Sequence, residues 1–297
     1  MLTYFYKLIM KITVLEPKGY CAGVKNAIAL AEQTKNKYSD REVFVYGNLV
    51  HNQVVIDHLT SLGIKTITYN DMLNDFVNLV PNNSVVIFTA HGHNVHLNKI
   101  AEDKGCIVID AICPKVKHNL DLISNELKNH KKVVYIGQEK HPETIGALSL
   151  SNDVILYSID KPNNYLKSTN DDLLVINQTT LNISEITNHY DFIKSFIPNA
   201  RFQDEICAAT RFRQEAIRNL DLDVDLVLVL GDKSSSNTNK LIDISLKYNS
   251  NIPCFLISSL NDISKDLVCN KKHIVISSGS STPPDFVDNV CSLIKSY

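Results

Sequence analysis

The sequence predicts an α/β fold made of three similar units, each with a mostly parallel sheet. Along the whole chain, short β-rich apolar runs alternate with stretches of helical periodicity, which is the pattern of parallel strands joined by helices. Three cysteines, Cys21, Cys113 and Cys207, follow one another at nearly equal intervals. Each opens a stretch of helical periodicity directly after a turn or a short strand. Equal spacing in similar surroundings indicates a threefold internal repeat.

Composition sets the broad class of protein. The chain has 297 residues, 44% of them hydrophobic and 21% charged, with a net charge of -2. This suits two or three compact globular units and gives no electrostatic attraction to nucleic acid or anionic membranes. No apolar run approaches the roughly 20 residues of a membrane span. Seven well-separated cysteines and no export signal predict reduced thiols in a cytoplasm rather than a disulfide framework.

The three expected units cover residues 1–112 with an N-terminal strand, 113–203, and 204–297 with a C-terminal segment. In each unit a helix follows the cysteine, and two apolar strands each end in a polar loop. Strands are expected over residues 12–16, 42–46, 84–88, 132–136, 173–176, 225–230 and 273–276. Met1–Met10 is expected to be an extra edge strand or to precede an alternative start.

The apolar stripes of the three helices are expected to face the core. They consist of Val24, Ala27, Ile28 and Ala31 after the first cysteine, Leu120, Ile123 and Leu127 after the second, and Phe212, Ala216, Ile217 and Leu220 after the third. Pro114 suits the first turn of the second helix. In parallel sheets ligands bind at the carboxyl ends of the strands, so the polar loops are expected to face one central cavity.

The polar loops carry the side chains of a candidate anion site. Asparagine, serine and neutral or charged histidine suit a phosphate or a diphosphate without a large net charge. The residues concerned are His51, His91, His141, Ser235, Ser236, Asn237 and Ser281. Ordinary turn chemistry is the alternative for any single loop, since serine and asparagine are common turn residues. A structural role is expected for the remaining histidines, His58, His93, His96, His118, His130, His189 and His273.

The three repeated cysteines are candidate metal ligands. Three thiolates fit a four-iron, four-sulfur cluster with one iron not held by protein, or a zinc ion with one open position. A helix start favours the thiolate form. The alternative is that they are buried apolar cysteines, a reading that we keep for Cys106, Cys254, Cys269 and Cys291.

Two further residues are candidates for proton chemistry. Glu143 follows His141 and a proline at the end of a predicted strand, where its carboxyl group can transfer protons or remain a solvated turn residue. Thr179 can relay a proton or hold a substrate hydroxyl. Thr180 can serve equally well as the cap of the next helix.

Read together, these motifs resemble the 4-hydroxy-3-methylbut-2-enyl diphosphate reductase (IspH/LytB) family from about Ile12 to Asp285. Their joint order is specific, although each alone is not. The motifs that carry the resemblance are Gly19-Tyr-Cys-Ala-Gly-Val24, Val50-His-Asn52, Ala90-His-Gly92, Asp110-Ala-Ile-Cys-Pro114, His141-Pro-Glu143, Asn177-Gln-Thr-Thr180, Ile206-Cys-Ala-Ala-Thr210, Gly231-Asp-Lys-Ser-Ser-Ser-Asn237 and Gly279-Ser-Ser-Thr-Pro283. Ile112 departs from the pattern, since threonine is common there, and no motif residue is missing.

The resemblance implies three pseudo-threefold-related α/β domains around a central cavity that holds a [4Fe-4S] cluster. Cys21, Cys113 and Cys207 match its three ligands, and the unligated iron takes the substrate's hydroxyl. The matching histidines, serines and asparagine named above bind the diphosphate. Glu143 matches the residue that supplies protons, and Thr179 the one that orients the hydroxyl.

The activity implied is that of an oxidoreductase in isoprene biosynthesis. Two electrons and two protons remove the hydroxyl as water, giving isopentenyl and dimethylallyl diphosphate, in the last step of the methylerythritol phosphate pathway. Ferredoxin or flavodoxin is the expected electron donor.

Two other functions remain as alternatives. A different three-cysteine cluster enzyme, such as a dehydratase or a quinolinate-synthase-like enzyme, would take a carboxylate-rich substrate and favour arginines in the polar loops, which contain none. A non-catalytic phospho-ligand binding protein or a zinc-stabilised scaffold would be colourless, whereas an iron–sulfur protein is brown.

Overall fold

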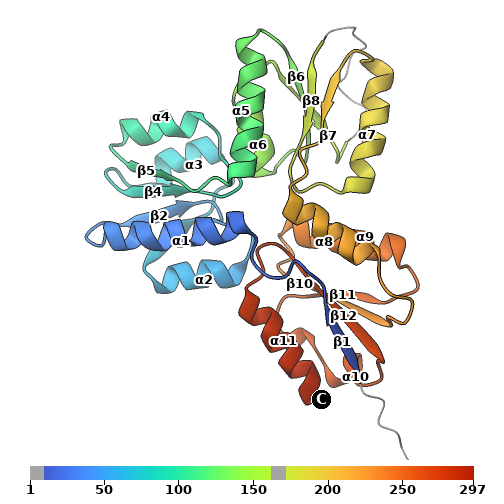
Figure 1. Cartoon of the computed structure of the whole chain (residues 1–297). Helices are drawn as coiled ribbons and strands as arrows, with labels where there is room; N and C mark the ends of the chain where they lie inside the picture. The colour runs from blue at the N-terminus through green and yellow to red at the C-terminus, as the bar shows by residue number, and fades with distance from the viewer. Residues whose placement is uncertain (1–9, 162–171) are drawn as a thin grey trace, which may run out of the picture. The chain divides into compact units, whose positions relative to one another are not determined.

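The computed structural model describes residues 10–161 and 172–297 and contains three four-stranded sheets, all of whose strand pairs are parallel. Helices connect the strands and cover the sheets (Figure 1). The α/β class with parallel sheets is thereby confirmed. All of Met1–Met10 except Met10 lies outside the described residues, so the expected edge strand there stays a prediction.

The first sheet runs in the order β3-β2-β4-β5. Its strands Val43–Tyr46 (β2) and Val85–Phe88 (β4) are buried on both faces, as strands covered by helices on both sides must be. Phe76 and Leu97 pack against one face from two of the helices. The other elements are α1 (Ala22–Lys37), α2 (Gln53–Ser61), β3 (Ile64–Ile67), α3 (Met72–Leu79), α4 (His96–Asp103) and β5 (Ile107–Asp110).

The second sheet runs in the order β7-β6-β8-β9. Side chains alternate along its strands, so Ile136 packs toward α7 on one face and Tyr135 toward α5 and α6 on the other. The elements are α5 (Pro114–Lys128), β6 (Val133–Gly137), α6 (Pro142–Leu148), β7 (Val154–Ser158), β8 (Leu174–Asn177), α7 (Ile183–Phe196) and β9 (Arg201–Gln203).

The third sheet runs in the order β1-β12-β10-β11, with β1 (Lys11–Val14) from the start of the chain beside β12 (His273–Ser278) from its end (Figure 1). Leu228 packs toward α10 and α11 on one face, and Val229 packs toward α8 and α9 on the other. The other elements are α8 (Ala208–Arg218), β10 (Leu226–Leu230), α9 (Ser236–Tyr248), β11 (Cys254–Ile257), a 3-10 turn Leu260–Asp262, α10 (Lys265–Val268) and α11 (Pro284–Ser296).

The same strand order occurs in all three sheets once β1 is counted as the fourth strand of the third sheet. In each, the second strand lies at one edge, followed by the first, the third and the fourth. We grouped the strand over residues 12–16 with the first unit, whereas it pairs with the last one. The chain accordingly forms two compact units, Met1–Cys21 with Ala208–Tyr297, and Ala22–Cys207. The boundaries at residues 112 and 203 stay a prediction.

Candidate active site

The three cysteines occupy the same position in each repeat. A helix begins directly after each of them, at Ala22, Pro114 and Ala208. The backbone N–H of each cysteine donates a hydrogen bond to a carbonyl oxygen in the loop after the third strand of one sheet. These strands are β12, β4 and β8, and the acceptor lies two residues beyond the end of the strand. The bonds are Cys21 to Ser280 at 3.0 Å, Cys113 to Ala90 at 2.9 Å and Cys207 to Thr179 at 3.1 Å.

The three repeated cysteines remain candidate metal ligands. All three side chains are half-buried, and none of the seven cysteines, all within the described residues, forms a disulfide. Each lies directly before the first residue of a helix of at least eleven residues. Cys113 and Cys207 belong to the unit 22–207, and Cys21 to the other unit. By the chemistry of its donor atoms, a set of three thiols is suited to iron–sulfur ligation.

The structure brings the three candidate histidines together at the carboxyl ends of β2, β4 and β6. The ring centroids of His51 and His91 are 4.6 Å apart, those of His91 and His141 5.7 Å, and those of His51 and His141 6.0 Å. The first two rings follow strands of the first sheet, and the third follows a strand of the second. Helix α6 approaches closely at Gly146, where an added Cβ would lie 3.1 Å from the His93 carbonyl oxygen.

Desolvation favours the neutral form of two of these histidines, His91 and His141. Desolvation, followed by the charges of His51 and His141, holds the pKa of His91 well below its ordinary value. Desolvation and then His51 lower the pKa of His141 to about 3. The Nδ1 atom of His141 accepts the N–H of Glu143 at 3.2 Å, so the ring proton of the neutral form lies on Nε2. That Nε2 is buried and has no hydrogen-bond partner among the described residues, which suits a donor to a ligand.

Glu143 and Thr179 form a buried pair in the same unit. The Thr179 hydroxyl donates to Oε1 of Glu143 at 2.8 Å, and the Thr179 N–H donates to Oε2 at 2.9 Å. Glu143 is 2% exposed. Desolvation raises its pKa to about 7, against the lowering effect of the two hydrogen bonds from Thr179. A carboxyl group that gains and loses a proton near neutral pH suits acid–base chemistry.

Local structure differs from expectation at two of these loops. His141 caps helix α6 through its ring, and Glu143 lies in the first turn of that helix, not in a free corner after the strand. Asn182, and not Thr180, caps helix α7 with its side chain. The Thr180 hydroxyl instead accepts a hydrogen bond from Gln178.

The remaining anion-site candidates lie in the unit that contains Cys21. Ser235 caps helix α9 and is 4% exposed, and Ser281 in the loop after β12 is also 4% exposed. Ser236 is the first residue of α9. Asn237 is 3% exposed, and neither atom of its side-chain amide has a hydrogen-bond partner among the described residues. A buried amide with unmet donors and acceptors is costly unless a ligand or water completes it.

The ends of β10 and β12 pack closely against Thr238 in this part of the candidate site. The sequence analysis did not predict this packing. Thr238 is completely buried, and a Cβ added to Gly231 or Gly279 would overlap its hydroxyl group. The Thr282 hydroxyl also donates to the carbonyl of Leu230, the last residue of β10. The signal available in the sequence was a glycine directly after each of these two apolar strands.

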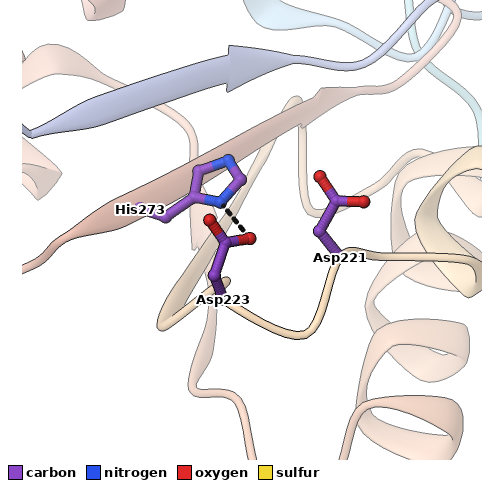
Figure 2. A group of neighbouring side chains, drawn as sticks. All are labelled: Asp221, Asp223 and His273. Carbon is purple, nitrogen blue, oxygen red and sulfur yellow. Dashed lines mark hydrogen bonds and ion pairs between the residues drawn. The ribbon is translucent and has the colours of Figure 1, made fainter.

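Asp221, Asp223 and His273 form the one compact group of possible metal ligands found among the described residues (Figure 2). Both ring nitrogens of His273 already have partners, Asp223 at 2.9 Å and the Thr13 hydroxyl at 2.8 Å. Lys11 lies 3.7 Å from Asp221 and 3.6 Å from Asp223 and supplies positive charge there. The group is therefore an ion-pair network at the start of β12, which agrees with the structural role expected for His273.

Among the helices of the described residues, none has both the length and the apolar character needed to cross a bilayer.

Comparison with known proteins gives a consistent result. The model of a family described as LytB protein matches residues 12–295. A 4-hydroxy-3-methylbut-2-enyl diphosphate reductase of Malacoplasma penetrans is 35% identical over 281 residues, covering 92% of this chain and 93% of that protein. The enzyme of the same name from Brevibacillus brevis is 33% identical and covers 97% of this chain and 92% of its own length.

Solved structures agree with the sequence relatives. The structure of the E-1-hydroxy-2-methyl-but-2-enyl-4-diphosphate reductase from Plasmodium falciparum matches with a TM-score of 0.82 at 29% identity, covering 96% of this chain and 87% of that one. A second structure, of an (E)-4-hydroxy-3-methyl-but-2-enyl diphosphate reductase called the terminal enzyme of the non-mevalonate pathway, matches with a TM-score of 0.67 at 27% identity, covering 97% and 100%. The chain therefore belongs to the LytB protein family.

Proposed function

We propose that the chain is a 4-hydroxy-3-methylbut-2-enyl diphosphate reductase. It reductively removes the hydroxyl of (E)-4-hydroxy-3-methylbut-2-enyl diphosphate and yields isopentenyl and dimethylallyl diphosphate in the last step of the non-mevalonate route. The observation that carries the proposal is the equivalent placement of Cys21, Cys113 and Cys207, each bonded through its N–H to the loop after a third strand. Family membership and the histidine group support it.

Cys21, Cys113 and Cys207 would hold a [4Fe-4S] cluster that has one iron without a protein ligand. Threefold repetition of the local structure supports this assignment, because each repeat offers one thiol and together they supply the three protein ligands that such a cluster would use. When bound, such a cluster supplies electrons and a Lewis-acidic iron next to the substrate.

The diphosphate would be bound by His51, His91, His141, Ser235, Ser236, Asn237 and Ser281. The lowered pKa values of His91 and His141 and the unmet amide of Asn237 support this role. Neutral N–H and O–H groups can donate strong hydrogen bonds to an anionic diphosphate, and several such bonds fix the orientation of the substrate.

Glu143 would be the proton donor, and Thr179 would orient the substrate hydroxyl. The overall reaction consumes two electrons and two protons, breaks the carbon–oxygen bond, forms one carbon–hydrogen bond and releases water. A carboxyl group with a pKa of about 7 is partly protonated at neutral pH and so can supply a proton to this exchange. Thr179 is in contact with both carboxyl oxygens and can pass the proton on through its hydroxyl.

Electrons would come from ferredoxin or flavodoxin, and the chain would work in the cytoplasm. The scattered arrangement of the seven cysteines in the sequence is the basis for expecting a reducing compartment.

Anaerobic purification tests the proposal directly. We expect a brown protein with about four irons per chain that turns over the allylic diphosphate when supplied with a reduced dye. A colourless chain that contains zinc, or a brown chain that leaves the allylic diphosphate unchanged, would overturn it. The first result would favour the scaffold alternative, and the second would favour a different cluster enzyme.

A further inference from the structure

Arg213 is a fully buried cation in a place where the repeat has neutral residues. It lies six residues after Cys207, in helix α8, and is 2% exposed. The residues six positions after the other two cysteines are Ala27 and Asn119, which are 1% and 2% exposed. All three face the interior, so the charge of Arg213 is a special feature of one junction between repeats. A buried guanidinium is costly unless its donors are used.

The guanidinium of Arg213 binds backbone oxygens of the segments that carry site residues. Its Nη2 donates to Gly19 at 2.7 Å, and its Nε donates to Ser278 at 3.0 Å. Gly19 precedes Cys21 by two residues, and its own N–H donates to the Ser278 hydroxyl at 2.9 Å. Ser278 ends β12 directly before the loop that contains Ser281. Arg213 thus joins the Cys21 segment to the helix that follows Cys207.

The preceding junction in the repeat has a corresponding charged contact. Lys115, two residues after Cys113, forms an ion pair and a hydrogen bond with Glu205, two residues before Cys207. The Glu205 side chain is 5% exposed, and Glu205 also donates its N–H to the Asn177 side chain at 3.0 Å. The equivalent positions at the third junction, Gly23 and Ala111, have no polar side chain. Two of the three junctions therefore carry a charged contact between consecutive cysteine segments.

We propose that Arg213 and the Lys115–Glu205 pair are positioning residues that hold consecutive cysteine-bearing segments in the arrangement needed to retain one iron–sulfur cluster. This inference rests on the proposed function. The Arg213 guanidinium binds the carbonyl oxygen of Gly19, which precedes the proposed ligand Cys21 by two residues. Arg213 therefore places a fixed positive charge near that ligand. Because nearby charge affects the reduction potential of a cluster, Arg213 should make the cluster easier to reduce.

Full-length, anaerobically reconstituted variants test the role of Arg213. Arg213→Gln should lose iron to a chelator several-fold faster than wild type, and its cluster should be reduced at a more negative potential. Arg213→Lys should restore the potential, because it keeps the charge, but only part of the iron retention, because an ammonium lacks the fork of the guanidinium. Arg218→Gln is the matched control, since it removes the same charge from the exposed end of the same helix. Equal rates and potentials for Arg213→Gln and Arg218→Gln would overturn the proposal.

The Lys115 contact provides an independent test that does not depend on a fully buried side chain. The Lys115 side chain is 36% exposed, so Lys115→Met should fold. It should release iron faster than Lys117→Met, which removes a surface ion pair to Asp121 on the same helix. Equal release from the two variants would remove Lys115 from the proposal. A wild-type chain that takes up no cluster would instead refute the proposed function, so the two failures are distinguishable.

Discussion

At the scale of single residues, Glu143 combines deep burial with a partner that contacts both of its carboxyl oxygens. The sequence indicated its chemistry through its motif but not its environment. Burial of a glutamate that follows a proline depends on which helix its loop enters and what packs on it, and those are tertiary features. The raised pKa that makes this carboxyl group a useful acid therefore could not be predicted from the chain alone.

Replacing Glu143 with glutamine should abolish most turnover while leaving the cluster and the fold intact. The amide keeps the shape and can still accept from Thr179, but it cannot give up a proton. A loss on the order of 100- to 10,000-fold in kcat is expected for the removal of a general acid. Steady-state kinetics with a reduced dye, together with the visible spectrum, measure both quantities. Wild-type turnover in Glu143→Gln would show that the proton comes from elsewhere.

The pKa of Glu143 also predicts a dependence on pH. Its pKa is raised from 4.5 to about 7 in the folded chain, so the protonated form is favoured by folding. Its contribution to stability is therefore complete below about pH 4.5 and is lost as the pH rises to about 7. Turnover should likewise fall as the pH rises above about 7. Denaturant titrations from pH 5 to 8 should show a steeper loss of stability in wild type than in Glu143→Gln, and parallel curves would contradict the assignment.

Cys113→Ser should lower the cluster content without unfolding the chain. A hydroxyl is a poorer ligand for iron than a thiolate, and the half-buried side chain changes little in volume. Iron analysis and visible absorption of the anaerobic protein measure the effect. Cys106→Ser is the matched control, because Cys106 is half-buried but lies outside the repeated position. If both variants keep full iron content, Cys113 is not a ligand.

At the scale of elements, the predicted strands were found because each is a continuous apolar run. The strand over residues 225–230 corresponds to β10 at Leu226–Leu230, and that over 84–88 to β4 at Val85–Phe88. Edge strands such as β3 and β9 were missed, since they are short and partly exposed and therefore carry a weak apolar signal.

Helix α8 shows where periodicity alone gave a wrong answer. The predicted apolar stripe included Phe212, which is 57% exposed, whereas its neighbour Arg213 is buried. Ile217 does face the core, as predicted. A charged side chain is tolerated on the inner face because it donates hydrogen bonds to the carbonyl oxygens of Gly19 and Ser278. Both residues are far from Arg213 in the sequence, so periodicity could not reveal these contacts.

The strand ends around Thr238 provide a test at this scale. Gly279→Ala should destabilise the chain by about 1–3 kcal/mol and raise the KM for the diphosphate, because the new methyl group overlaps the buried Thr238 hydroxyl and displaces the loop with Ser281. A second substitution, Thr238→Ala, should recover most of both effects by removing the obstacle. Denaturant unfolding and steady-state kinetics measure them, and an additive double variant would refute the steric explanation.

At the scale of the whole molecule, the spacing of the cysteines correctly indicated the threefold repeat. It did not indicate that the first strand of the described residues, β1, completes the third sheet. The first strand of the chain pairs with the last one, Lys11 opposite His273 and Val14 opposite Ile276. A local sequence pattern indicates that residues 11–14 form a strand, but it does not indicate which sheet the strand joins. Its partner, β12, lies more than 250 residues further along the chain.

Removing residues 1–14 should therefore damage the opposite end of the chain. Without β1, the buried edge of β12 loses its hydrogen-bonded neighbour, and the segment with Cys21 loses its anchor. We expect a lower unfolding midpoint and a loss of iron, measured by thermal denaturation and metal analysis. Removal of residues 1–9 alone is the reference, so that the difference between the two variants measures the effect of removing residues 10–14, which include β1. Full iron content in the shorter variant would show that β1 does not position Cys21.

The pairing of β1 with β12 also has a consequence for biogenesis. Strand β1 is synthesised long before β12, its neighbour in the sheet, and the Cys21 N–H binds the backbone of Ser280, which lies just beyond β12. During synthesis, this edge of the sheet can therefore close, and the backbone of Cys21 can be held in place, only after β12 has been made.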